Sequence, residues 1–332
     1  MTTLKCMSFR LWPVLALGML WGCQAEPRFT LLDEKLTGVS FSNRLTETAQ
    51  INIFTYLYFY NGGGVAIGDV NNDGMPDLYF TANQDSNRLY LNRGDFRFED
   101  VTVQSGALGS LGWTTGVTMA DVNHDGLLDI YVSQLGDYKT IIGRNQLFIN
   151  KGVDGKGIPQ FVDEAADWNL DLIGFSTQAA FFDYDLDGDL DMYMLNHSVH
   201  SNGTFGRSDI RKEVHPLAGD KLLRNEGNHF VDVTQQAGIY SSALGYGLGI
   251  STGDINSDGW PDVYIGNDFH EDDYLYINNG NGTFTEGLAS AMPHTSRFSM
   301  GNDLGDINND GLLDILSLDM HPDEPVRLKS SA

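Results

Sequence analysis

The chain has 332 residues, 41% of them hydrophobic and 11% aromatic, which is enough to build a sizeable core and too apolar for a disordered acidic chain. Its formal net charge of −25 argues against nucleic acid or anionic lipid as a partner, because their phosphates would be repelled. The two cysteines, Cys6 and Cys23, both lie near the N-terminus, so the rest of the chain has no disulfide framework.

Residues 1–22 are predicted to be a lipoprotein signal peptide. Basic residues precede an apolar run, 11–21, that is too short to span a bilayer as a helix. The following Leu20-Trp-Gly-Cys23 resembles a bacterial lipobox, which implies lipidation of Cys23; the alternative is a plain secretory signal with an incidental cysteine. We therefore expect an exported protein of the bacterial cell envelope or outer membrane, or of the cell surface, held at the membrane through an N-terminal lipid anchor only.

Residues 63–332 contain one acidic motif five times. It has Asp at its first, fifth and ninth positions, Asp or Asn at its third, and Gly at its sixth. The copies span residues 69–77, 121–129, 183–191, 254–262 and 306–314. Their first aspartates are 52 to 71 residues apart, which is typical of a supersecondary unit repeated along the chain.

Each motif lies between segments with strand character. In the first unit, residues 65–69 lead into the motif, residues 77–81 leave it, and residues 88–92 and 96–102 form two further strands. The next three units repeat this order, and the fifth has only its first two strands. The sequence therefore predicts an all-β fold, a β-propeller of four-stranded blades that is incomplete or truncated, with four full blades and part of a fifth.

The glycine-led strand, the D-x-[DN]-x-D-G-x-x-D loop and the aliphatic-aromatic strand after it resemble FG-GAP or VCBS repeats, the calcium-binding propeller blades also present in integrin α-subunits. The resemblance covers roughly residues 64–318 and is greatest to bacterial exported VCBS-repeat proteins of the cartilage-acidic-protein-like group. It implies a propeller, usually of about seven blades.

Residues 23–62 form an N-terminal segment without an acidic motif. Within it, Phe29–Gly38 resembles the fourth-strand pattern Phe230–Gly238. Because propellers commonly close with an outer strand lent by one terminus, we predict that this segment supplies a closing strand to the last blade.

The acidic motifs are predicted to bind calcium, about one ion per loop and up to five in all, because calcium takes six to eight oxygen ligands in a flexible shell. The predicted side-chain ligands are Asp69, Asn71, Asp73, Asp77, Asp121, Asn123, Asp125, Asp129, Asp183, Asp185, Asp187, Asp191, Asp254, Asn256, Asp258, Asp262, Asp306, Asn308, Asp310 and Asp314. The backbone carbonyls of Met75, Leu127, Asp189, Trp260 and Leu312 are predicted to add a further oxygen in each loop.

Three alternative interpretations fit the motif less well. An EF-hand needs a glutamate at position twelve and flanking helices, and neither is present. Magnesium demands stricter octahedral geometry and retains its waters. Turns rich in Asp, Asn and Gly also form without metal, but several carboxylates in one tight turn would repel each other unless neutralised.

The order of strands predicts the faces of the propeller. The acidic loops share one face, and the long connections 133–144, 197–219 and 267–272, with the turns near Trp113 and Tyr246, share the other. We expect any ligand on this second face, because binding residues favour loops on a rigid scaffold. The histidines of the third unit, His197, His200 and His215, could hold a metal or a polar ligand, but loop packing is the preferred interpretation. Four tyrosines that recur at one position are expected to pack between blades rather than to stack sugars: Tyr79, Tyr131, Tyr193 and Tyr264.

Neither HExxH nor CxxC occurs in the chain. We therefore predict a non-enzymatic, calcium-stabilised binding or adhesion protein of the cell envelope, which recognises a protein or glycan through the loop face. Two alternatives remain: a propeller-type hydrolase or lyase, and a structural fragment of a larger envelope assembly.

Overall fold

The structure, a computed structural model, describes residues 29–200 and 208–320. The predicted signal peptide and Cys23 lie outside the described residues. Within the described ranges, no helix combines the length and the apolar character needed to cross a bilayer.

Antiparallel sheets make up nearly all of the described chain. Four sheets have four strands each, hydrogen-bonded in chain order, and a fifth has two. The first sheet contains β1 (Val65–Gly68), β2 (Asp77–Phe80), β3 (Arg88–Asn92) and β4 (Phe98–Asp100), and the second contains β5 (Trp113–Ala120), β6 (Asp129–Leu135), β7 (Gln146–Val153) and β8 (Pro159–Asp163). The third contains β9 (Ser176–Phe182), β10 (Asp191–Asn196), β11 (Lys221–Asn225) and β12 (Phe230–Asp232), and the fourth contains β13 (Gly247–Gly253), β14 (Asp262–Asn267), β15 (Tyr274–Asn278) and β16 (Phe284–Glu286). The fifth contains β17 (Ser299–Gly305) and β18 (Asp314–Asp319).

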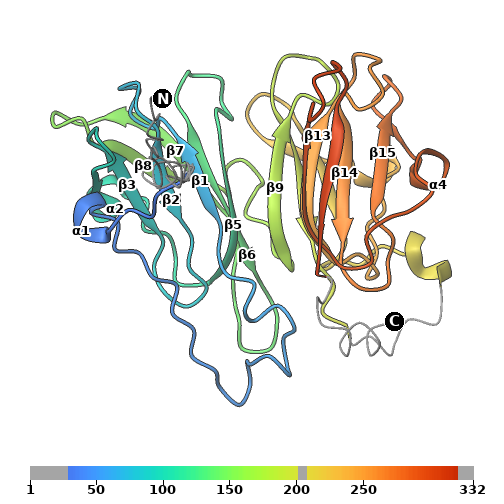
Figure 1. Cartoon of the computed structure of the whole chain (residues 1–332), viewed down its shortest axis with the longest axis horizontal. Helices are drawn as coiled ribbons and strands as arrows, with labels where there is room; N and C mark the ends of the chain where they lie inside the picture. The colour runs from blue at the N-terminus through green and yellow to red at the C-terminus, as the bar shows by residue number, and fades with distance from the viewer. Residues whose placement is uncertain (1–28, 201–207, 321–332) are drawn as a thin grey trace, which may run out of the picture.

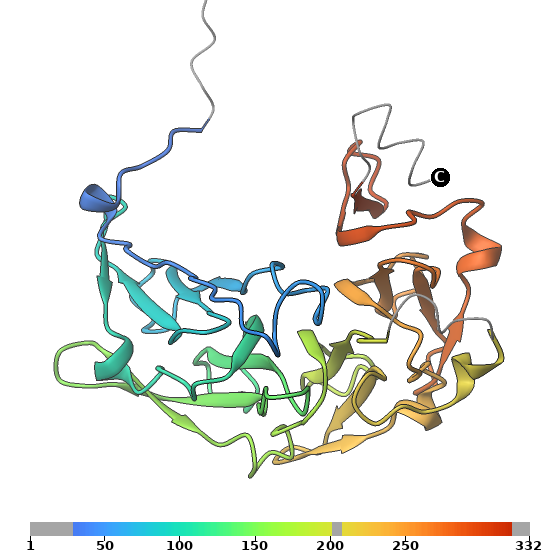
Figure 2. The ribbon, with the colours of Figure 1, turned by 90° about the horizontal axis from the view of Figure 1, so that it is seen from below.

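The sheets lie side by side around a common axis. The first strands of successive sheets contact one another, from β1 through β5, β9 and β13 to β17. Figure 1 shows the sheets from the side, and Figure 2, turned to look along this axis, shows an arc that does not close between the first sheet and the last. The predicted all-β fold, with four full blades and part of a fifth, is therefore confirmed.

Short helices follow the outer strands: α2 (Thr102–Ser105), α3 (Thr234–Ala237) and α4 (Leu288–Ala291). Helix α1 (Glu34–Thr37) precedes the first sheet, and a 3₁₀ helix, η1 (Ser208–Lys212), lies in the connection between β10 and β11.

Apolar layers between neighbouring sheets form the core. Between the first two sheets, Leu89 and Leu91 of β3 lie in one buried cluster with Ile130 of β6. The four recurring tyrosines are at most 2% exposed, and each hydroxyl donates a hydrogen bond at the rim of its sheet: Tyr79 to Ala107 O (2.8 Å), Tyr131 to Leu170 O (3.1 Å), Tyr193 to Asp220 Oδ2 (3.0 Å) and Tyr264 to Asp273 Oδ2 (2.6 Å). Their predicted packing role is confirmed.

Asparagines at the ends of the third strands join each sheet to the one before it. The side-chain amide of Asn150 donates to Val70 O (2.8 Å) in the acidic loop of the preceding sheet. The amide of Asn278 likewise donates to Tyr184 O (2.8 Å). Because each such amide lies within the interface and satisfies a carbonyl of the neighbouring loop, it links two sheets at the level of their acidic loops.

The N-terminal segment differs from the prediction. Residues 29–33 form no strand, and Phe29 is 92% exposed, so the expected closing strand on the last sheet is wrong for this structure. The likeness to the end of the third unit holds only in the helix: α1 ends at Gly38 with φ +77°, as α3 ends at Gly238 with φ +81°. A Cβ on Gly38 would lie 2.4 Å from Phe98 O, so this glycine packs closely against the outer strand of the first sheet rather than the last.

Candidate metal centres and the opposite loop face

Each acidic loop connects the first strand of a sheet to the second, and all five follow one backbone path. The glycine at the sixth position has φ between 85° and 101°. The residue at the fourth position is also left-handed, with φ between 57° and 61°, although it is never glycine and is a leucine, Leu186, in the third loop. A left-handed leucine is unfavourable, so the fold imposes this path on the sequence.

The first aspartate organises each loop from within. In the first loop, one oxygen of Asp69 accepts from the amide of Asp73 (3.1 Å) and the other from the amide of Gly74 (2.7 Å). The carboxylate of Asp73 in turn accepts from the amide of Met75 (2.9 Å). The equivalent bonds recur in the other four loops. Backbone amides thus hold the first and fifth side chains beside one another in every copy.

The ninth aspartate has a different environment. Asp77 is fully buried; one oxygen accepts from the amide of Asn92 (2.8 Å) and the other from the amide of Val70 (3.0 Å). Burial raises the pKa of Asp77 to about 6, although these two bonds oppose the shift. The pKa of Asp191, its counterpart in the third loop, is raised to about 8 by burial, with Asp185 and Asp189 adding to the shift. These aspartates connect the acidic loop to the end of the third strand, and their role as metal ligands stays a prediction.

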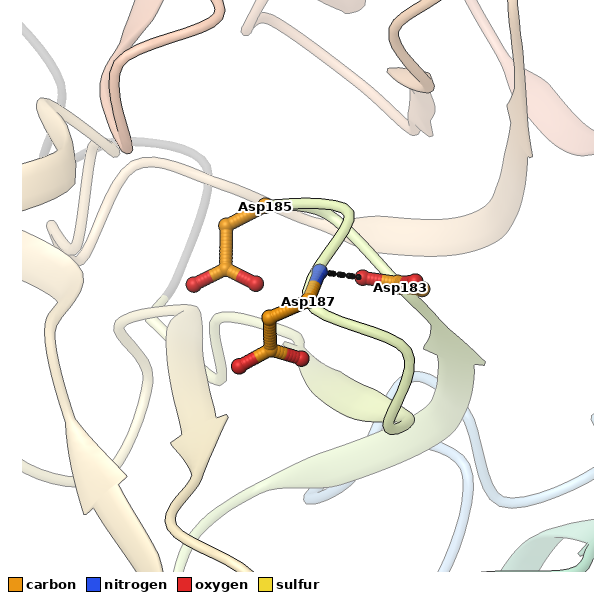
Figure 3. Close-up of side chains that lie close together, drawn as sticks. All are labelled: Asp183, Asp185 and Asp187. Atoms are coloured by element: carbon orange, nitrogen blue, oxygen red, sulfur yellow. Dashed lines mark hydrogen bonds between the residues drawn. The ribbon is translucent and has the colours of Figure 1, made fainter.

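The third loop has the greatest concentration of acid. Carboxylate oxygens of Asp183, Asp185 and Asp187 all lie within 4.8 Å of one another (Figure 3). Burial and the neighbouring carboxylates raise the pKa of Asp185, and the same causes raise that of Asp189 to about 6. Within the described ranges, Oδ1 of Asp185 and Oδ1 of Asp189 are buried oxygens without a hydrogen-bond partner.

This donor set fits a hard divalent cation. Three convergent carboxylates and buried, unpartnered oxygens are the chemistry that calcium prefers, and a cation would offset their mutual repulsion. The other four loops have the same backbone geometry but place an asparagine at the third position; in three of them its amide donates to the fifth aspartate at 2.9–3.0 Å. The third loop therefore has the strongest case for a bound metal.

The opposite face differs from the expectation. Residues 48–62, called the covering segment here, lie across it and bury their own Ile51, Tyr56, Tyr58 and Phe59 against the long connections. Trp113 and Tyr246, expected to lie at a ligand-binding surface, are 4% and 1% exposed beneath this segment. The ammonium of Lys139 donates to Thr55 O (2.9 Å), and the hydroxyl of Tyr138 also donates to this carbonyl. Figure 2 shows this early part of the chain, in blue, along the inner edge of the arc.

The sequence did carry a signal for the covering segment. Residues 51–60, INIFTYLYFY, are rich in apolar and aromatic side chains but lack the acidic loop that marks a repeat unit. Such a run indicates that the segment is buried but does not identify the residues it packs against. Those residues come from three different sheets, which only the fold brings together.

The three histidines do not converge on one point. His197 is 2% exposed, and its ring nitrogens lie 3.1 Å from the hydroxyl of Tyr56 and 3.2 Å from that of Thr177. The ring of His215 lies 5.5 Å from that of His200, and its Nδ1 accepts backbone amides. Within the described part of the chain, only Asp183, Asp185 and Asp187 of the third loop bring three potential metal-ligating side chains of His, Cys, Asp or Glu close together.

Comparison with known proteins supports the repeat assignment. A family profile described as FG-GAP-like repeat matches residues 69–132 and 254–317. Cartilage acidic protein 1 of Mus musculus is 26% identical over 321 residues, covering 92% of this chain and 45% of the relative. The Homo sapiens protein of that name is 27% identical over 306 residues, covering 88% of this chain and 42% of the relative. The chain thus spans less than half the length of these curated relatives.

Among solved structures, an Agrocybe aegerita lectin described as recognising non-reducing terminal N-acetylglucosamine has a TM-score of 0.33 and 16% identity, covering 76% of this chain and 73% of the lectin. At that score the likeness supports no inference about a ligand. The matched repeats and the relatives agree with the sheets and loops described above: the chain is an FG-GAP-like repeat protein related to cartilage acidic protein 1.

Proposed function

We propose that this chain is a calcium-stabilised, non-catalytic binding module of the cell envelope, which recognises a protein or glycan through the face formed by the covering segment and the long connections. The observation that carries the calcium part is the third loop, where three carboxylates converge beside buried oxygens that lack partners. Since no cysteine lies within the described residues, bound cations would replace the cross-links that disulfides supply in other exported domains.

Large apolar side chains on the loop face support a binding role. Phe54 of the covering segment is 95% exposed, and Leu111 and Ile142 are 81% and 82% exposed. Leu111 and Ile142 line one groove of about 350 Å³, together with Ile51 and Gln84. Single exposed apolar residues are ordinary, but several beside a groove are typical of partner surfaces.

The chemistry of the buried groups supports a non-catalytic role. Burial lowers the pKa of His197 to about 3 and raises the pKa of Tyr56, so neither group exchanges protons near neutral pH. The segment Gly249–Gly253 fits the spacing of a hydrolase nucleophile motif, yet Ser251 lies inside β13 rather than at a strand-to-helix turn. Its hydroxyl donates to Asn302 Oδ1 (2.6 Å).

The first test is thermal unfolding of the whole chain with and without a chelator. We expect EGTA to lower the melting temperature and calcium, but not equimolar magnesium, to restore it. An ion present at about 100 times its Kd stabilises the fold by about 2.7 kcal/mol per site. A melting temperature unchanged by EGTA would contradict the calcium assignment.

Recognition is tested separately on glycan and peptide arrays, in calcium and in EGTA. We expect calcium-dependent binding that is reduced by Phe54→Ser and Ile142→Ser but not by Val103→Ser, a change of an equally exposed apolar residue on helix α2. Turnover of polysaccharide or peptide pools by the purified chain would instead favour a hydrolase or lyase.

A further inference from the structure

A cavity of about 330 Å³ lies on the axis of the arc. Its lining includes one residue from or next to the first strand of every sheet, namely Gly64, Thr115, Gln178, Leu248 and Met300. This volume is at the small end of the range of roughly 300–1,000 Å³ for ligand sites. The cavity contains no residue of the acidic loops, and it shares only Trp113 with the exposed groove on the loop face.

Backbone crowding explains why side chains are scarce around the axis. Five residues before each first aspartate the chain has glycine in four sheets: Gly64, Gly116, Gly249 and Gly301. A Cβ on Gly64 would lie 2.9 Å from Val117 N, and one on Gly116 would lie 2.3 Å from Thr177 O. The third sheet has Gln178 at this position. A single side-chain amide therefore lines the cavity at the level where the other sheets present backbone.

The amide of Gln178 is available to a ligand. It is half-buried, and within the described part of the chain it makes no side-chain hydrogen bond. A half-buried amide with two donor hydrogens and an acceptor oxygen can recognise hydroxyl groups. The repeat does not require a side chain at this position, because the other four sheets have glycine there.

The side of the cavity nearest the covering segment is built from polar and aromatic groups. Tyr56, Tyr58 and Trp113 supply aromatic walls, and His197 lies among them. Hydrogen bonds fix the ring of His197 between the hydroxyls of Tyr56 (3.1 Å) and Thr177 (3.2 Å). These groups are already positioned by the fold, so a ligand would not have to order them.

Among the residues that the structure describes, no Asp, Glu, Lys or Arg lines the cavity. Its histidine is buried, as described above, and a charged ligand would therefore leave water without a counter-ion. Aromatic walls, the amides of Asn61 and Gln178 and several hydroxyls suit a neutral ligand that has both an apolar face and hydroxyl groups.

We propose that the axial cavity binds a neutral, hydroxyl-rich small molecule of monosaccharide size, with Gln178 as the residue that selects it. This goes beyond the proposed function, because the ligand is a small molecule and Gln178 lies at the axis, outside the exposed residues of the loop face. The two proposals can therefore fail independently.

The test uses the whole chain in calcium and saturation-transfer difference NMR with D-glucose, D-galactose and myo-inositol as probes. Glucose 6-phosphate and glucuronate serve as charged counterparts. We expect saturation transfer to at least one neutral probe and none to the charged ones. No transfer to any neutral probe at 10 mM, or equal transfer to the charged analogues, would overturn the proposal.

Two variants locate the site. Gln178→Gly, which restores the residue of the other four sheets, and Tyr56→Phe should each weaken binding of the neutral probe by roughly 5- to 10-fold. The matched control is Gln160→Gly, the same change in outer strand β8, away from the axis. Retained binding in Gln178→Gly, with its melting temperature unchanged, would show that the probe binds elsewhere and would overturn the assignment. Array binding to the loop face should be unaffected by Gln178→Gly, which separates this result from the proposed function.

Discussion

Asp220 provides the sharpest test of the energetics, because a carboxylate there occupies a place that asparagine fills in the first two sheets. It is 6% exposed; one oxygen accepts from the amide of Asn196 (2.9 Å) and the other from the hydroxyl of Tyr193 (3.0 Å). In the first two sheets the same position before the third strand has Asn87 and Asn145, each accepting one backbone amide. Burial raises the pKa of Asp220 from its ordinary 3.8 to about 7, against the opposing effect of these two bonds.

The sign of the pH dependence follows from this shift. A carboxyl whose pKa is raised in the folded state favours folding when protonated, so its contribution is full below pH 3.8 and is lost as the pH rises through 7. The whole shift corresponds to about 4 kcal/mol as an upper value, of which about 2–3 kcal/mol falls between pH 5 and pH 8.5. Asp220→Asn removes the titration and can keep both hydrogen bonds.

The assay is urea unfolding of the wild type and Asp220→Asn, in saturating calcium, at several values between pH 5 and pH 8.5. We expect the difference in free energy of unfolding, variant minus wild type, to increase by about 2–3 kcal/mol as the pH rises across this range. The reciprocal change Asn145→Asp, in the second sheet, should introduce a similar loss at high pH. Parallel stability curves for wild type and Asp220→Asn would refute the reasoning, since they would mean that Asp220 is ionised without cost.

Three further predictions concern the sheets and the loops. Asn278→Ala should lower the free energy of unfolding by about 2–3 kcal/mol, because it leaves a carbonyl of the preceding sheet unpaired. Asn92→Ala should cost about 1 kcal/mol in urea unfolding, because the side-chain amide of Asn92 donates to Pro76 O within its own sheet. Equal losses would contradict the interface role. Gly116→Ala should lower the free energy of unfolding by about 1–3 kcal/mol, because the added Cβ would clash with backbone of the neighbouring sheet. The control Gly155→Ala, at a position with open space, should change it by no more than about 0.5 kcal/mol. An unchanged melting temperature for Gly116→Ala would count against close packing at the axis. Asp185→Asn should raise the melting temperature in EGTA, because it removes one of the carboxylates that repel each other in the third loop. It should also reduce the stabilisation by calcium by about 1.4 kcal/mol, which corresponds to a tenfold loss of calcium affinity. A lower melting temperature in EGTA would show that carboxylate repulsion is not important there.

The acidic loops and the strands around them were predictable because their determinants are local. Glycine and aspartate at fixed offsets specify the turn, and the flanking strands alternate in the usual way. The recurring Tyr131 and its counterparts were correctly assigned to packing for the same reason: one residue type at one blade position has one environment.

The parts that depend on distant partners were not predictable. The covering segment has no repeat pattern, and its burial depends on connections from three sheets that only the fold brings together. The segment Phe29–Gly38 resembled an outer strand, yet a strand needs a neighbour to pair with, and only the helix and the left-handed Gly38, which are local, formed as the likeness suggested. The left-handed Leu186 was also beyond prediction, because its side chain disfavours the conformation that the loop imposes.

The asparagine hydrogen bonds between sheets all run the same way along the arc, from a donor in the later sheet to an acceptor in the earlier one. The second, third and fourth sheets each carry, in the third strand, an asparagine that donates to the acidic loop of the preceding sheet, as Asn150 does to Val70. The first three acidic loops in turn present the acceptor for the sheet that follows, as Tyr184 does for Asn278. A duplicated unit would therefore contain both the asparagine donor for the sheet before it and the carbonyl acceptor for the sheet after it. Repeats could then be gained or lost in evolution without redesign of the interfaces. On this view the number of units is limited by the curvature of the arc and not by the chemistry that joins them.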